Sequence, residues 1–230
     1  MHFQHSAEIW RDFPTLVPGV VLVEDVAPDT SVTEKVAVFN ARADERLATV
    51  SEGEMPEIQA WRRTFSKMGL KPTQYRCASE SLLRRYRKEN SLPQIHPLID
   101  LCNAVSLAYA IPIAVIDTSQ ISEYLEVRYA HGTESYLTFS GETETAPAGE
   151  VVFADGAGQA HARRWTNRQS GLSAIKPTTT SALIVAEALH DSASADVEGL
   201  VNDLVRELSL LWSVGSKPAV LSPSAPRFDF

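Results

Sequence analysis

Cysteine is scarce in this sequence of 230 residues, which contains only Cys77 and Cys102 and no Cys-x-x-Cys pair. Two isolated cysteines fit reduced thiols better than a disulfide framework or a zinc site. No apolar run approaches the ~20 residues that a membrane span requires. The first ten residues also lack the apolar segment of a secretory signal. We therefore expect a cytoplasmic protein without a membrane partner.

Complete motifs of cofactor-dependent and serine enzymes are also missing. Gly156-x-Gly158 lacks the third glycine and the following helix of a dinucleotide fingerprint, so Asp155-Gly156 indicates a hairpin turn instead. Ser173-x-x-Lys176 has the spacing of a serine nucleophile with a lysine base, but Pro177 breaks the helix that this motif needs. We expect no cofactor.

The nearly apolar segment 98–109 predicts a buried helix whose strong polar residues are Asp100 and Asn103. His96 and Asp100 are four residues apart, but no third metal ligand stands at a suitable spacing. We therefore expect no metal and favour local helix capping. Burying a carboxylate costs several kcal/mol unless it is paired, so an arginine just upstream is the expected partner of Asp100.

The net charge of −8 argues against a nucleic-acid-binding protein, and we expect no DNA partner, but this average hides a contrast. Segment 62–88 holds nine basic residues and one acid, so it carries +8 while the rest carries −16. A second basic stretch lies between residues 161 and 176. Such patches attract phosphates even on an acidic protein, although solvated helix faces are the alternative. The candidate RNA-binding residues are Arg62, Arg63, Arg76, Arg84, Arg85, Arg163, Arg164 and Arg168.

Apolar periodicity predicts helices at 54–68, 76–88, 98–109 and 193–214, the last one amphipathic. Short strands are predicted at 20–26, 113–116, 124–130, 135–139, 151–154, 160–165 and 183–186. The pattern indicates an antiparallel or mixed sheet system with helices. Residues 1–19 are interpreted as a lead-in, and residues 215–230 as an extended tail.

The stretch 163–171 combines guanidinium groups, an indole, amides and hydroxyls before a glycine. Arginine forks bind phosphate or carboxylate, and Trp165 beside them could stack on a base or on an aromatic amino acid. Glu187 is the one charge in the apolar run 182–189. It is expected either to pair inside the protein, for example with an arginine of this stretch, or to bind a polar group of a ligand.

Six short motifs follow one another between residues 76 and 189. They are Asp100-Leu-Cys-Asn103-Ala-Val, Pro112 with Asp117, Val127-Arg128-x-Ala130-x-Gly-x-Glu, Val152-Phe-Ala-Asp155, Ser170-Gly171, and Thr180 with Glu187. Their order resembles that of the B3/B4 domain of bacterial phenylalanyl-tRNA synthetase beta subunits. Each motif alone is weak, but six in the right order with sensible spacing are a strong signal.

The resemblance implies an α+β fold, a layered sheet/sheet/helix sandwich, as one domain over residues 1–230. In the synthetase this domain hydrolyses the ester of tyrosine wrongly attached to the phenylalanine tRNA. Because 230 residues leave no room for a synthetase catalytic core, the resemblance implies a stand-alone protein.

Two departures from the family pattern bear on activity. The histidine of the family's Pro-x-His motif falls at Ala114, and its Gly-Gly segment aligns with Arg164-Trp165 or Thr166-Asn167. Glu187 is retained at the position that, by resemblance, recognises the tyrosine hydroxyl. A ligand pocket is therefore expected, whereas tyrosine specificity and deacylase activity are both in question.

Two functions are therefore considered. The first is a tRNA-binding, aminoacyl-tRNA editing protein that hydrolyses a mischarged ester. The second is a non-catalytic binding module that kept the fold and binds an amino-acid-like metabolite or a protein. No Ser-His-Asp set is visible, so no catalytic residue is assigned. The expected substrate-binding residues are Asn103, Trp165, Asn167, Gln169, Ser170 and Glu187.

Overall fold

The structure, a computed structural model, describes residues 1–212 and 216–230. The helices are α1 (Ala7–Asp12), α2 (Thr33–Leu47), α3 (Pro56–Lys67), α4 (Ala78–Glu89), α5 (Pro97–Tyr109) and α6 (Ala193–Trp212). The strands are β1 (His2–His5), β2 (Val17–Val23), β3 (Ile113–Asp117), β4 (Leu125–Tyr129), β5 (Ser135–Leu137), β6 (Thr143–Thr145), β7 (Val151–Asp155), β8 (Ala160–Arg163), β9 (Arg168–Gln169), β10 (Ala182–Ala188), β11 (Ser216–Val220) and β12 (Arg227–Asp229).

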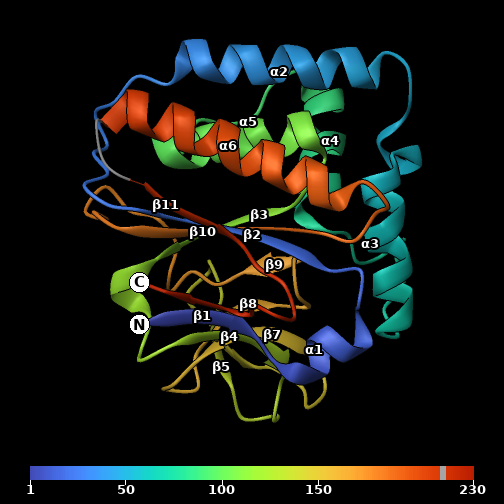
Figure 1. The fold of residues 1–230 in the computed structure, drawn as a ribbon, viewed down its shortest axis with the longest axis vertical. Coiled ribbons are helices and arrows are strands. Elements are labelled where there is room, and N and C mark those ends of the chain that lie inside the picture. The colour runs from blue at the N-terminus through green and yellow to red at the C-terminus, as the bar shows by residue number, and fades with distance from the viewer. Residues whose placement is uncertain (213–215) are drawn as a thin grey trace.

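These elements form layers, with α2 outermost, then α5 and α6, then one sheet and then a second sheet (Figure 1). The α+β class and the sheet/sheet/helix order are confirmed. One apolar core lies between the helices and the first sheet, and another lies between the two sheets and α3. No helix in the described part of the chain has the length and apolarity needed to cross a bilayer.

The first sheet is antiparallel, in the order β11-β2-β10-β3. All seven residues of β10 are buried, because helices cover one face of this strand and the second sheet covers the other. At Gly19 on β2, an added Cβ would lie 2.6 Å from a methyl group of Val201 and 2.7 Å from one of Val197. Glycine therefore allows α6 to pack directly on this sheet.

The second sheet has the order β12-β1-β4-β7-β8-β9, with β1 parallel to β4 and the other pairs antiparallel. Asp155 ends β7 and accepts backbone N–H bonds from Ala157 and Gln159, which closes the β7–β8 turn. Gly158 in this turn has a φ of +75°, which glycine adopts without strain. The predicted hairpin turn is confirmed.

Both ends of the chain correct the expectation of a lead-in and a tail. The first residues form β1 and α1, while β11 and β12 extend the two sheets and bring the C-terminus beside the N-terminus (Figure 1). Pro218 lies on β11, an edge strand, where a missing N–H is tolerated. The helix predicted at 193–214 is α6, and its last two predicted residues, with residue 215 of the tail, lie outside the described residues.

The start of α5 confirms local capping. The Nδ1 atom of His96 accepts the N–H of Leu98 at 3.2 Å, and Asp100 accepts the N–H of Ile95 at 2.9 Å. The predicted arginine partner of Asp100 is wrong, because its carboxylate holds the turn before the helix. Both cysteines are free and buried, and burial raises the pKa of the Cys77 thiol to about 11.

Candidate functional site

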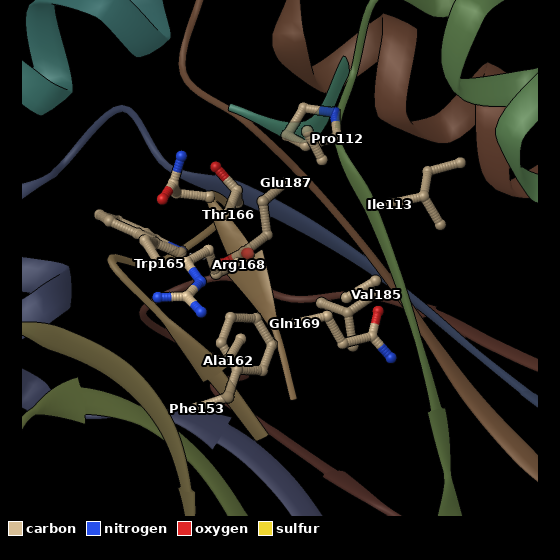
Figure 2. A pocket seen from close by; sticks show the side chains of 13 residues that line it. Pro112, Ile113, Phe153, Ala162, Trp165, Thr166, Arg168, Gln169, Val185 and Glu187 are labelled. Carbon is tan, nitrogen blue, oxygen red and sulfur yellow. Dashed lines mark hydrogen bonds between the residues drawn. The ribbon is translucent and has the colours of Figure 1, made fainter. Parts of the chain in front are cut away.

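A pocket of about 60 Å³ opens beside β10, between the two sheets (Figure 2). Its walls are apolar, and its rim is formed by the turn that connects β8 to β9. The wall residues include Pro112, Ile113, Phe153, Ala162 and Val185, and the polar residues are Thr166, Asn167, Arg168, Gln169 and Glu187. An apolar cavity with a few convergent polar groups is the usual form of a small-molecule site.

Glu187 lies at the base of this pocket and is only 1% exposed. Its Oε1 atom accepts a hydrogen bond from the indole N–H of Trp165 at 2.8 Å and lies 2.6 Å from Nε2 of His5. Glu187 is thus paired inside the protein, and its partners are Trp165 and His5 rather than an arginine. Since a buried carboxylate is costly when unpaired, these two contacts explain how β10 accommodates the charge.

Trp165 fills the space behind the pocket and is fully buried. Its ring makes edge contacts with Phe13 and Trp61, at centroid distances of 4.9 and 5.1 Å. The expected stacking of Trp165 on a base or an aromatic ligand is therefore wrong, because protein atoms surround the indole ring and leave none of it exposed. Trp165 instead orients Glu187.

The backbone before the pocket rim is left-handed at two successive residues. Arg164 has a φ of +47° and Trp165 a φ of +56°, a region that favours glycine. Of the two alignments of the Gly-Gly segment, this conformation favours Arg164-Trp165. Holding two larger residues there costs on the order of 1–3 kcal/mol each, which the burial of Trp165 offsets.

The rim amides are held in fixed orientations. Asn167 donates to the carbonyl of Arg76 at 2.8 Å, and Gln169 donates to the carbonyl of Val115 at 2.7 Å. The Thr166 hydroxyl is buried and has no hydrogen-bond partner among the described residues. The pocket therefore offers a ligand one unused hydroxyl and preset amide groups.

A family model described as the B3/4 domain matches residues 60–203, which is more than half of the chain. The chain belongs to the B3/4 domain family. The pocket residues lie inside the matched range, and the resemblance found in the six motifs is confirmed.

Among solved structures, the chain is similar to the crystal structure of an N-terminal fragment of the phenylalanyl-tRNA synthetase beta-subunit from Pyrococcus horikoshii, with 12% sequence identity and a TM-score of 0.47. This similarity covers 94% of the present chain and 49% of that fragment, so the chain spans about half of the fragment's length. No curated protein matches the sequence.

In this B3/4 domain, two of the six predicted substrate-binding residues lie outside the pocket. Asn103 lines a different cavity, between α2 and α5. Ser170 is fully buried, and its hydroxyl donates to the carbonyl of Leu137 at 2.9 Å. A Cβ at the adjacent Gly171 would lie 3.0 Å from the carbonyl oxygen of Thr138, so the Ser-Gly motif serves close packing.

The arginines in the second basic stretch of this B3/4 domain form internal ion pairs. Arg163 binds Glu150 at 2.7 Å and also pairs with Glu144, and its side chain is 5% exposed. The bond to Glu150 raises the pKa of the Arg163 guanidinium. Arg164 and Arg168 pair with the same two carboxylates. Burial contradicts the RNA-binding role predicted for Arg163.

The arginines of α3, of α4 and of the segment between them are partly paired and partly exposed. Arg62 and Arg76 both bind the buried Glu80, at 2.7 and 3.3 Å. The side chains of Arg84 and Arg85 remain 46% and 51% exposed, although they contact Glu52 and Glu89. Arg63 is exposed, and no ion pair of Arg63 occurs within residues 1–212 or 216–230. The sequence count of +8 therefore overstates the free charge of this surface.

Sequence reasoning missed His5 and most of the apolar wall. His5 comes from the region interpreted as a lead-in and reaches Glu187 because β1 joins the second sheet beside β4. No sequence pattern indicated this contact. Phe153 and Pro112 belong to two of the six motifs. Both could have been predicted if the apolar residues of each motif had been interpreted as pocket walls.

Proposed function

We propose that this domain binds the aminoacyl end of a tRNA and holds the amino-acid moiety in the pocket beside Glu187. The carrying observation is that Trp165, Asn167 and Gln169, which follow β8, meet Glu187 of β10 in one pocket within the B3/4 match. Relation to a domain of a tRNA synthetase supports a tRNA ligand. The Thr166 hydroxyl and the rim amides supply polar groups for an amino acid.

The size of the pocket favours a small amino-acid side chain. For comparison, an engineered protein cavity of about 150 Å³ binds benzene. The pocket offers about 60 Å³, because the Trp165 indole occupies the space behind Glu187. A tyrosyl ring would have to displace Trp165 from its bond to Glu187, whereas an alanine-sized or serine-sized group fits as the site stands.

The exposed arginines of α4 are the proposed contacts for the tRNA backbone. Arg84 and Arg85 lie on the helix whose N-terminal residue, Ala78, lines the pocket. Guanidinium groups bind phosphate through paired N–H bonds. A nucleic acid lying along α4 would therefore have its end near the pocket.

Ester hydrolysis is the proposed reaction, and it needs a positioned water and a stabiliser for the oxyanion. The described lining residues include no histidine, cysteine or serine, so the substrate's own hydroxyl or Thr166 would have to orient the water. Ala114 at the pocket wall favours a second candidate, a module that binds the aminoacyl group without cleaving it.

A panel of tRNAs charged with small and aromatic amino acids tests both candidates. We expect release from a tRNA carrying a small amino acid faster than in buffer, or, for the second candidate, tighter binding of the charged than of the uncharged tRNA. Ala114→Leu fills the pocket and should reduce either effect at least tenfold, while Ala148→Leu, at an exposed position, should not. Absence of both release and discrimination would refute the proposed function.

A further inference from the structure

Three metal-ligating side chains meet at a place that shares no residue with the pocket. Glu57 lies in the first turn of α3, His190 follows β10, and Asp196 lies in the first turn of α6. One ring nitrogen of His190 and one oxygen of each carboxylate lie within 4.8 Å of one another. Glu57 and His190 are only 6% and 5% exposed. Figure 1 shows α6 beginning beside α3, which brings these segments together.

The hydrogen bonds around this cluster leave two buried atoms unused. Nε2 of His190 lies 2.8 Å from Oδ2 of Asp196, which also accepts the hydroxyl of Ser192 at 2.6 Å. Arg46 donates to Oε1 of Glu57 at 2.7 Å. Oε2 of Glu57 and Nδ1 of His190 have no partner among the described residues. Buried polar atoms are nearly always satisfied, so each of these orphaned atoms has room for a further partner.

We propose that Glu57, His190 and Asp196 bind one divalent transition-metal ion of the zinc class. Imidazole nitrogen and carboxylate oxygen are ligands that zinc accepts at about 2.0–2.2 Å, and three protein ligands leave a fourth position for water. Arg46 and Ser192 hold the two carboxylates from outside, as partners of metal ligands commonly do.

Charge supports a cation at this place. With a neutral imidazole, the two carboxylates outweigh the guanidinium of Arg46 by one negative charge. The Glu57 carboxylate lies largely out of water, where attraction for an ion is stronger than at an exposed surface, whereas the Asp196 side chain is 36% exposed. A water molecule is the competing occupant, because a polar site of this kind can also hold a buried water.

A bound ion would stabilise the wall behind the pocket. His190 follows Glu187 by three residues, and Trp61 of α3 donates its indole N–H to the carbonyl of Glu187 at 3.2 Å. Linking α3, the end of β10 and α6 through one ion would therefore fix the strand that carries Glu187. The inference does not depend on the tRNA proposal, because it rests on other residues.

The test loads the full chain with Zn²⁺ or Co²⁺, removes loose metal by dialysis and measures bound metal and affinity. We expect one equivalent per chain, bound at least tenfold more weakly by His190→Gln and by Glu57→Gln. His131→Gln is the matched control, because this histidine is 73% exposed and pairs with Glu134 elsewhere. Its affinity for the metal should equal that of the unaltered chain.

The absorption spectrum of the Co²⁺-loaded, unaltered chain keeps the test decisive if a variant fails to fold. Intense visible bands of a four- or five-coordinate ion support the proposal. Weak bands of a fully hydrated ion, no stoichiometric binding, or binding that only His131→Gln removes would overturn it and leave water as the occupant.

Discussion

On α4, the side chains of Arg84, Arg85 and Arg87 are 46%, 51% and 50% exposed, whereas the Arg163 side chain on β8 is 5% exposed. Both regions read in the sequence as arginine clusters suited to phosphate. In the fold, Arg163 is enclosed by Glu144, Glu150 and the ring of Tyr136. The arginines of α4 keep roughly half of their surface in water. Burial, rather than the number of arginines, decides which cluster can meet a ligand.

The two regions also differ in what their ion pairs contribute to stability. Exposed pairs contribute about 0–1 kcal/mol, because water screens the charges and two long side chains lose freedom. Breaking a buried pair costs about 3–5 kcal/mol, because the remaining charge is left without a partner or water. The sheet around β8 should therefore depend on its ion pairs, whereas the exposed pair Arg85–Glu89 on α4 should contribute little.

Removing Arg163 gives the largest expected effect. Arg163→Met keeps much of the side-chain volume but leaves Glu150, whose side chain is 10% exposed, without its main partner. We expect a loss of about 3–5 kcal/mol in the free energy of unfolding, measured by urea denaturation. Arg168→Met is the matched control, since this side chain is 39% exposed and should cost under about 1 kcal/mol. Equal losses for the two variants would remove the distinction between the regions.

Acid titration of Glu134 gives the next largest effect. Burial acts to raise the pKa of Glu134, but the N–H of His131 and the Arg128 guanidinium outweigh it and lower the pKa from 4.5 to about 2. The depressed pKa stabilises the fold fully above about pH 4.5, and this contribution is lost as the pH falls towards 2. It amounts to on the order of 3 kcal/mol.

Urea midpoints measured from pH 7 to pH 2 check this expectation. Glu134→Gln should be less stable at pH 7 and should show a shallower decline in acid than the unaltered chain. Glu89→Gln removes an exposed partner of Arg85 on α4 and should leave both the midpoint and the slope nearly unchanged. If the urea midpoint of Glu134→Gln fell with pH as steeply as that of the unaltered chain, other carboxylates would be responsible for the loss of stability in acid.

The helices α3, α4 and α5 and most strands of the second half were predictable, because their apolar spacing is regular and glycine or proline marks their ends. Helix α2 was missed because only Phe39 and Ala43 are buried along its 15 residues, too few for a clear apolar stripe. Strands β11 and β12 were missed because Pro218 and neighbouring polar residues resemble a tail. Their strand character comes from pairing with β2 and β1, which lie far away in sequence.

The sequence predicted which residues belong to the candidate site, but not how their side chains are oriented. The stretch 163–171 and the motifs together placed Trp165, Asn167, Gln169 and Glu187 in one ligand site, and all four line the pocket. They could not show that Trp165 points inward, because two left-handed residues in a row are not visible in sequence. They also placed Asn103 in the pocket, although this helical residue faces a cavity on the other side of the first sheet.

The smallest effect on stability, and the sharpest test of the comparison, is expected on α4. The pair Arg85–Glu89 spans 2.9 Å at an i, i+4 spacing with both side chains about half exposed, so Arg85→Ala should change the free energy of unfolding by less than about 0.5 kcal/mol. If this face contacts tRNA, the variant should nevertheless lower affinity and reduce the slope of log affinity against log salt by about 0.7–0.9 per lost phosphate contact.

Arg206→Ala is the control, because Arg206 lies on α6 rather than on α4. Its side chain is 58% exposed and pairs with Asp203 and Glu207 of the same helix. Binding titrations over a series of salt concentrations, with a urea melt of each variant, separate the outcomes. Equal slopes for Arg85→Ala, Arg206→Ala and the unaltered chain would mean that α4 is a solvated helix face, so that exposure alone does not make an arginine cluster a binding surface.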